Sequence, residues 1–421
     1  MRVVLLSKAL VVGAYQRKAE EIARHEDIEL IVLVPPAWRD ERGVLPLERA
    51  HTRGYTLLVE PIALNGHFHL HFYPRLGRRL RALRPDLLHI EEEPYNLATW
   101  HAVRIAKRMG IRTIFFSWQN LLRRYPPPFC WWEREVLRSA AVAMAGSETA
   151  ARVWRAKGYA GPLAVIPQVG VDPEWFSPAM ERLPQPFTIG YVGRLVPEKG
   201  VDLLLRAVAG LPGDWRVRIV GSGPEGPALR RLAERLGLSG RVSFEPPVPS
   251  TCMPEVYRGL DALVLPSRTR RNWAEQFGRV LVEAMACGVP VIGSSAGEIP
   301  WVIGEAGLVF PEDREDALRE ALRCLMEDHA LYQSLRDKGR QRVLERFTHQ
   351  RIAEATVAVY RAVAASSSVV GGFQKAERGG AVHEWGTNTR IICVFVLNSW
   401  PAPPLQYRIL ALPRRGRGKE G

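Results

Sequence analysis

The stretch from Ala274 to Gly293, AEQFGRVLVEAMACGVPVIG, reads as a short buried helix followed by a buried strand, yet it carries two glutamates eight residues apart. If the helix begins at Gly278, Glu283 lies in its second turn and Glu275 lies just before it. Eight residues of ideal helix span about 12 Å with the ends rotated by only about 80°, so both carboxylates are expected on one side. A nucleotide-sugar has about that length from hexose to ribose.

The start of this helix predicts a phosphate site between the two acids, because free N–H groups and the positive end of the dipole lie there. One carboxylate could then accept hydroxyl hydrogens from a sugar and the other from a ribose. The alternative is that Glu275 only caps the helix and Glu283 is solvated. The aliphatic neighbours of Glu283 count against this alternative, since an unpaired charge among them would be costly.

A second loop, GRLVPEKG, supplies two cations for the same ligand. Gly193 follows a predicted strand, and Arg194 and Lys199 lie five residues apart after it. A charge-assisted contact to phosphate contributes roughly 1.5–3 kcal/mol. The sequence has neither the dinucleotide glycine fingerprint nor the phosphate loop of ATPases, which disfavours hydride transfer and ATP hydrolysis.

Short apolar runs alternate with helical patterns along most of the chain, which predicts α/β structure with parallel sheets. In the first half the predicted strands are 2–7, 28–35, 86–92, 112–117, 142–147 and 163–168, and the helices are 17–24, 76–83 and 97–109. In the second half the strands are 187–193, 215–221, 241–246, 262–267, 290–294 and 307–310, and the helices are 201–208, 227–236, 278–287 and 314–327. The stretch 67–72, HFHLHF, alternates like an edge strand.

We therefore predict two tandem Rossmann-like, doubly wound domains that face each other across a cleft, where ligands of open parallel sheets bind. The first covers residues 1–178 and the second 186–347, with a proline-bearing linker between them. Residues 348–364 form a terminal helix. The composition changes from 365 to 421, and for this tail we favour a poorly ordered extension over a functional module.

The composition is that of a folded globular protein, with 47% hydrophobic and 24% charged residues. The net charge of +14 divides into +5 from Ser366 onward and +9 before it, which favours contact with phosphates or an anionic membrane. Nucleic acid is disfavoured because no aromatic–basic platform or helix-turn-helix pattern is present. Five scattered cysteines fit a reducing compartment, and we expect neither a signal peptide nor a membrane span.

The motifs together resemble the retaining glycosyltransferases of family 4, also called glycosyl transferases group 1, which have the GT-B fold. The specific segments are EQFGRVLVEAMACGVPVIGSSAGEIPWVI, YVGRLVPEKGVDLLLRA and, between them, VRIVGSGPEGPALRRLAERLGLSGRVSFEPPV and ALVLPS. The resemblance is strong over 187–347 and weaker over 1–178, where HIEEEPYNLAT, SWQN and VIPQVGVDPEWFSP are similar to the acceptor-side domain. It implies that helix 348–364 crosses back to the first domain.

The resemblance also implies roles for individual residues. Arg194 and Lys199, with Gly193, would bind the donor diphosphate, and Glu275 would contact the transferred sugar as the catalytic residue. The remaining donor contacts would be backbone N–H groups of Phe277, Gly278 and Arg279, ribose hydroxyls at Glu283, and a nucleobase near Val248. The family uses no metal, so no cofactor is expected.

The acceptor side departs from the family pattern, because Trp118-Gln119-Asn120 stands where many members have a histidine. Another group would take its place, with His89, Glu93 and Gln119 as candidates, although His89 is more often a packed strand-end residue. Gly13 and Ala14 would form a small loop that faces the acceptor.

The expected function is transfer of a hexosyl unit from a nucleotide-diphosphate sugar to a glycan, lipid-linked or small-molecule acceptor, with retention of configuration. This predicts a cytoplasmic enzyme of cell-envelope polysaccharide or glycolipid synthesis, or one that is peripheral on the inner face of the membrane. Two rivals stay open: a nucleotide-sugar epimerase on the same scaffold, and a basic membrane-surface protein without catalysis.

Overall fold

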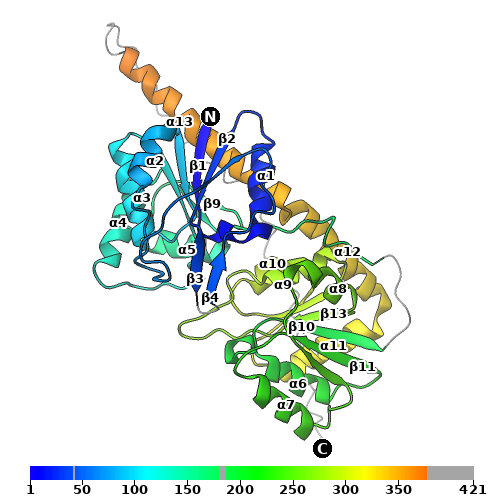
Figure 1. The fold of residues 1–421 in the computed structure, drawn as a ribbon. Helices are drawn as coiled ribbons and strands as arrows, with labels where there is room; N and C mark the ends of the chain where they lie inside the picture. The colour runs from blue at the N-terminus through cyan, green and yellow to red at the C-terminus, as the bar shows by residue number, and fades with distance from the viewer. Residues whose placement is uncertain (41–42, 180–185, 377–421) are drawn as a thin grey trace, which may run out of the picture. The chain divides into compact units, whose positions relative to one another are not determined.

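The computed structural model describes residues 1–40, 43–179 and 186–376 of the 421-residue chain (Figure 1). They form two compact units, of which the first contains Met1–Asp172 together with the described residues from Arg346 to Ala376, and the second contains Pro173–Glu345. Residues 173–178, which we assigned to the first domain, therefore belong to the second unit. No helix in the described part of the chain combines the length and the apolarity that crossing a bilayer requires.

The first unit is built on a parallel sheet of seven strands in the order β5-β2-β1-β6-β7-β8-β9. The strands are β1 (Arg2–Leu6), β2 (Glu29–Val34), β5 (Thr56–Val59), β6 (Leu87–Ile90), β7 (Arg112–Ser117), β8 (Val142–Ala145) and β9 (Leu163–Val165). The apolar runs of the five inner strands are buried on both faces, as parallel strands require, whereas the edge strands β5 and β9 are partly exposed. Because the strand order reverses at β1, the switch point of this sheet lies between β1 and β6.

Helices cover both faces of this sheet (Figure 1). On one face α1 packs against α13, the long C-terminal helix, and on the other face α2, α3, α4 and α5 form the second layer. The bounds are α1 (Arg17–Ala23), α2 (Leu76–Leu83), α3 (Leu97–Arg108), α4 (Phe129–Ser139), α5 (Glu148–Ala156) and α13 (His349–Ala376), with short 3-10 turns η1 (Ala9–Val11) and η2 (Gly13–Gln16) after β1.

Helix α13 belongs to the first unit but is longer than the sequence suggests. It buries Ile352, Val357 and Tyr360 against the sheet. It continues to Ala376, so residues 365–376 are helical and our boundary at 364 is wrong. The rest of the predicted tail, 377–421, lies outside the described residues.

The second unit contains a six-stranded parallel sheet in the order β12-β11-β10-β13-β14-β15. Its strands are β10 (Phe187–Val192), β11 (Trp215–Val220), β12 (Val242–Glu245), β13 (Ala262–Leu265), β14 (Val291–Ser294) and β15 (Leu308–Phe310). This is the order of the dinucleotide-binding folds, and its switch point lies between β10 and β13.

Two groups of neighbouring helices flank the second sheet, α6 with α7 and α11, and α8 with α9 and α10 (Figure 1). Their bounds are α6 (Val201–Ala209), α7 (Gly226–Arg235), α8 (Met253–Arg258), α9 (Arg279–Ala286), α10 (Ile299–Ile303), α11 (Glu315–Glu327) and α12 (His329–Arg346), with 3-10 turns η3 (Pro197–Lys199) and η4 (Ser250–Cys252).

The stretch 67–72 is not a strand, and this prediction is wrong. It forms turns, with a single bridge between Ala63 and Phe72. Its alternation has another cause, because His71 is fully buried and its ring lies 4.9 Å from that of Trp38. The antiparallel pair β3 (Ala37–Asp40) and β4 (Gly43–Pro46) in the same unit has no counterpart among our predicted elements.

Candidate functional site

The predicted donor residues gather at the switch point of the second sheet. Strand β10 pairs with β11 on one side and with β13 on the other, so the loops after β10 and β13 leave the same edge together. The loop after β10 carries Gly193 and Arg194, and the loop after β13 begins with Pro266 and Ser267. Ligands of open parallel sheets bind at this position.

Close backbone contact with the neighbouring loop holds the Arg194 loop in place. Leu195 N–H donates to the carbonyl of Ser222 at 2.9 Å. At Gly221 a Cβ atom would lie only 1.9 Å from the carbonyl oxygen of Gly193, and its φ of +148° also disfavours a side chain. Glycine is therefore required where the two loops meet.

Lys199 and Glu275, 76 residues apart in the chain, form an ion pair at this edge. Lys199 Nζ lies 2.5 Å from Glu275 Oε2, and Ser267 Oγ donates to the same oxygen at 3.0 Å. The ammonium also lies 5.0 Å from the ring centroid of Trp273. Glu275 is only 8% exposed, so the pair is partly withdrawn from water. The structure thus joins the predicted diphosphate cation to the predicted sugar carboxylate.

Helix α9 begins beside this pair, as the sequence predicts. Gly278 is its N-cap residue with φ +75°, a left-handed conformation that favours glycine. The ring of Phe277 is buried, and Arg279 is the first helical residue with its side chain 42% exposed. A helix start presents N–H groups without intrahelical partners, which suits an anion.

Glu283 is buried and paired, so the alternative of a solvated helix residue is wrong. Its Oε2 accepts a hydrogen bond from the Tyr257 hydroxyl at 2.6 Å, and its Oε1 lies 2.8 Å from Arg279 Nε. Burial and the adjacent carboxylate together raise the pKa of Tyr257 well above its usual value, so this hydroxyl stays a donor.

Sequence reasoning missed Ser267, Trp273 and Tyr257. Ser267 has a usable signal, since it directly follows the apolar run ALVLP at a strand end, whereas Trp273 and Tyr257 have none. Val248, the residue predicted near the nucleobase, is partly buried in the loop after β12. Strand β12 lies two strands from β10 in the sheet.

The switch point of the first sheet is occupied by buried ion pairs. Glu91 pairs with Lys18 and Glu92 pairs with Lys8, with His71 Nε2 3.6 Å from Glu92. Burial alone would raise the pKa of Glu92, but Lys8 and His71 hold it at about 2. These pairs fix the loop after β6 from which Glu93 projects.

Two predicted acceptor-side residues, Glu93 and Gln119, meet through Ser117. Ser117 Oγ donates to Glu93 Oε2 at 2.5 Å and accepts from Gln119 N–H at 3.0 Å, while Trp118 N–H donates to Glu93 Oε1 at 2.8 Å. Lys157 Nζ lies 3.2 Å from Gln119 Oε1 and extends this network. Burial outweighs the hydrogen bonds and raises the pKa of Glu93 to about 7.

His89 is a packing residue, and its placement contradicts the acceptor contact considered from the sequence. The side chain is fully buried, and Nδ1 lies 2.7 Å from the hydroxyl of Tyr360 on α13. Burial lowers its pKa to about 4. The residue therefore ties the sheet to the C-terminal helix.

The predicted loop at Gly13 and Ala14 is split between interior and surface. Gly13 is buried, and its N–H donates to Glu48 Oε2 at 2.6 Å, whereas Ala14 is exposed. A Cβ at Gly13 would lie 2.8 Å from that of Ala50, so segment 48–50 covers this loop.

Comparison with known proteins agrees with this geometry. The model of a family described as glycosyl transferases group 1 matches residues 175–342, and that of a glycosyl transferase 4-like domain matches 12–168. The D-inositol 3-phosphate glycosyltransferase of Mycobacterium marinum is 34% identical over 210 residues, 46% of this chain and 43% of that protein. Its counterpart in Mycobacterium ulcerans is 31% identical over 248 residues, 54% of this chain and 52% of that protein.

These alignments span about half the length of the relatives. Among solved structures, sucrose-phosphate synthase from Thermosynechococcus elongatus aligns with a TM-score of 0.65 at 21% identity. The alignment covers 87% of this chain and all of the synthase chain. Anabaena Alr3699/HepE, solved in complex with UDP, has a TM-score of 0.66 at 18% identity over 86% of this chain and all of that one. The two family models are adjacent and each coincides with one sheet, so residues 175–342 form a domain of the group 1 glycosyl transferases, residues 12–168 form a glycosyl transferase 4-like domain, and the chain has the GT-B fold.

Proposed function

We propose that this protein transfers a sugar from a nucleotide-diphosphate donor to an acceptor hydroxyl. The observation that carries the proposal is the Lys199–Glu275–Ser267 group at the switch point, next to the start of α9. A cation, a helix start and a carboxylate within one small region are the groups that a diphosphate joined to a sugar needs. UDP-sugars are the first donors to test, because a protein of the same fold binds UDP.

The donor would lie along α9. Its diphosphate would meet Arg194, Lys199 and the N–H groups at Phe277, Gly278 and Arg279. Glu275 would accept hydroxyl hydrogens of the sugar.

Glu283 would take the ribose, although it already accepts one hydrogen bond from Tyr257 and lies next to Arg279. Each carboxylate oxygen has a second lone pair, so ribose hydroxyls can be added without breaking these contacts. The nucleobase would extend toward Val248.

We propose that transfer proceeds without a metal and with retention of configuration. Leaving-group charge would be stabilised by Lys199, Arg194 and the dipole of α9, which take the place of a divalent cation. In that case the enzyme mainly positions the acceptor on the leaving-group face of the sugar. The Glu93–Ser117–Gln119 network would orient the acceptor hydroxyl.

The acceptor would be a glycan, a lipid-linked molecule or a small molecule, and we place the enzyme in the cytoplasm, at the inner face of the membrane. Exposed basic residues on one helix layer of the first unit support peripheral contact with anionic lipid, namely Arg75, Arg78, Arg81 and Arg84 in and around α2. Trp131 on α4 of the same layer is 59% exposed. Cell-envelope glycolipid or polysaccharide synthesis would use both features.

Calorimetry with UDP, GDP and ADP tests the donor site. Loss of both cations in Arg194→Gln/Lys199→Gln removes about 3–6 kcal/mol of contact, so binding should weaken by two orders of magnitude or more. Arg231→Gln/Arg235→Gln, which also removes two positive charges but from exposed positions of α7, is the control and should bind normally. Undiminished binding by the double variant, with EDTA present, would refute the proposed site.

Product analysis separates transfer from its rivals. Incubation of a bound nucleotide-sugar with candidate acceptors should give a glycosylated product by mass spectrometry, with the donor's anomeric configuration by NMR. An epimerase would convert the nucleotide-sugar without any acceptor. A purely membrane-binding protein would retain all function in Glu275→Ala.

A further inference from the structure

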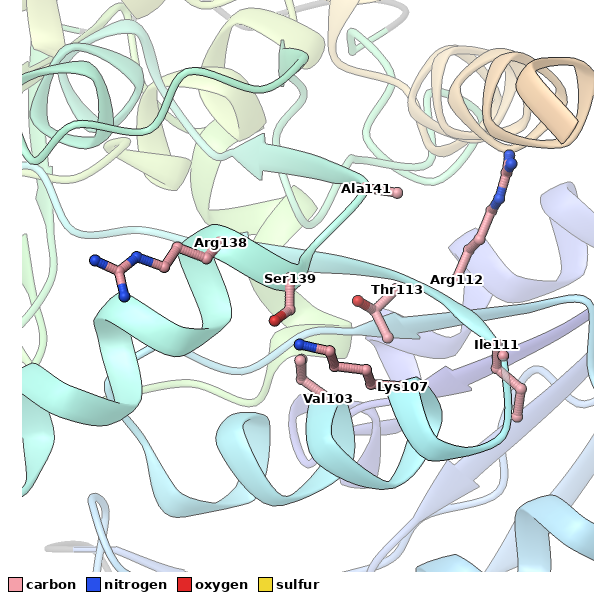
Figure 2. A pocket seen from close by; sticks show the side chains of 9 residues that line it. Val103, Lys107, Ile111, Arg112, Thr113, Arg138, Ser139 and Ala141 are labelled. Carbon is pink, nitrogen blue, oxygen red and sulfur yellow. The ribbon is translucent and has the colours of Figure 1, made fainter. Parts of the chain in front are cut away.

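A cavity of about 340 Å³ opens at the amino end of the first sheet (Figure 2). It lies where α3 and α4 end and where β7 and β8 begin. Its lining consists of Val103, Lys107, Gly110, Ile111, Arg112, Thr113, Arg138, Ser139 and Ala141. This volume is near the lower limit for sites that take small molecules.

The polar groups of this cavity converge without satisfying one another. Figure 2 shows the ammonium end of Lys107 directed toward Ser139, and Thr113 lines the same cavity. Thr113 is only 3% exposed. Within the described residues, the side chains of Thr113, Ser139 and Lys107 make no hydrogen bond or ion pair. A buried hydroxyl directed at a cavity, with a cation next to it, is suited to a ligand that accepts hydrogen bonds.

The charged residues that line the cavity are all positive. Three of its nine residues are cations, Lys107, Arg112 and Arg138, and none is an acid. Arg112 donates to the carbonyl of Val363 on α13, and Arg138 extends away along α4 in Figure 2, so these two stand at the rim. Lys107 is the central cation.

A simpler explanation accounts for part of this pattern. Lys107 and Arg138 lie in the last turns of α3 and α4, where the helix dipole favours cations without any ligand. That explanation does not require the hydroxyl of Thr113, which comes from the sheet, to face the same space. Two helix C-termini alone would explain the cations. They would not explain why the hydroxyls of Thr113 and Ser139 line the same cavity as Lys107.

We propose that this cavity binds a phosphate group, carried either by a small phosphorylated molecule or by a lipid headgroup. The site is separate from the acceptor network, because Thr113 precedes Ser117 by four residues on β7 and four strand steps span about 13 Å. It also stands apart from the transferase proposal, since no donor or acceptor residue lines it.

Calorimetric titration of the full chain with inorganic phosphate tests the site. All proteins in this test carry Arg194→Gln and Lys199→Gln, so that phosphate at the proposed donor loop does not contribute. Saturable binding at millimolar phosphate is expected, and Lys107→Gln should weaken it about tenfold or more. Thr113→Val, which keeps the shape and removes the hydroxyl, should weaken it by about threefold to tenfold.

The matched control is Arg108→Gln, an exposed cation that directly follows Lys107 on α3 and does not line the cavity. It should leave phosphate binding unchanged. Should Thr113→Val fail to give a native circular dichroism spectrum, Lys107→Gln decides, because the exposed side chain of Lys107 has no partner among the residues that the structure describes.

Vesicles identify the source of the phosphate. Sedimentation with phosphatidylglycerol vesicles that falls in Lys107→Gln, but not in Arg108→Gln, supports a lipid headgroup, and binding of free phosphate without such a difference supports a small molecule. No saturable phosphate binding and no Lys107-dependent sedimentation would overturn the proposal. Equal losses in Lys107→Gln and Arg108→Gln would also overturn it, since they would indicate a diffuse basic surface.

Discussion

Glu93→Gln should remove a specific pH dependence of stability. In the folded chain the Glu93 carboxylate accepts hydrogen bonds from Ser117 Oγ and Trp118 N–H, yet burial raises its pKa from 4.5 to about 7. Glutamine has nearly the same shape and cannot titrate. The variant therefore isolates the cost of ionising this one group.

The sign and size follow from the linkage between proton binding and folding. Since the pKa of Glu93 is higher in the folded chain, the folded state binds the proton more tightly, and stability falls as pH rises. The loss begins near the unfolded value of about 4.5 and is complete above about 7. A shift of this size corresponds to roughly 3 kcal/mol in the free energy of unfolding.

Urea unfolding of the wild type and the variant at several pH values, followed by circular dichroism, measures the difference in their unfolding free energies. This difference should shift in favour of Glu93→Gln by about 3 kcal/mol between pH 4.5 and 7, and stay constant above pH 8. Glu26→Gln, the same change at an exposed glutamate of the first unit, is the matched control for the substitution itself. A flat or oppositely sloped curve for Glu93→Gln would refute the reasoning.

Two further changes test the donor side. Tyr257→Phe removes the 2.6 Å hydrogen bond to the buried carboxylate of Glu283 and should lower the free energy of unfolding by about 1.5–3 kcal/mol, as measured by urea titration; an unchanged midpoint would contradict the bond. Gly221→Ala places a Cβ atom 1.9 Å from the Gly193 carbonyl and should weaken nucleoside diphosphate binding at least tenfold by calorimetry. Gly240→Ala, where a Cβ meets nothing within 4 Å, should bind normally.

The twelve strands predicted from apolar runs all exist, with ends that differ by at most three residues from those observed, and only the alternating stretch 67–72 is wrongly predicted as a strand. This agreement has a physical cause. A strand buried on both faces of a parallel sheet must be apolar along its whole length, so its run ends where the chain leaves the sheet. The helices that have a strong apolar stripe, such as α2 and α9, are also predicted correctly. The side of a helix that packs on a sheet must be apolar, so the stripe marks the helix.

Helix α12 shows where the pattern fails. Among its eighteen residues only Leu335, Gly339 and Val343 are buried, and one of these is a glycine. The apolar stripe is therefore too thin to predict a helix. The opposite error occurred at 67–72, where histidines and apolar residues alternate although the chain makes turns.

The two candidate sites differ in how far their residues can be inferred from the sequence, because they are built from different parts of the chain. At the donor edge, motifs that are local to the backbone, a glycine that caps α9 and a glycine that allows two loops to touch, mark the two loops on which Lys199 and Glu275 lie, although this pair is itself 76 residues apart. At the first switch point the features are side-chain pairs, Lys18 with Glu91 and Lys8 with Glu92, whose members lie 73 and 84 residues apart. Nothing in the neighbourhood of either lysine indicates its partner. A site built from backbone geometry can be predicted from motifs, whereas one built from distant charge pairs requires the fold itself, and the pKa of Glu93 is a property of that second kind.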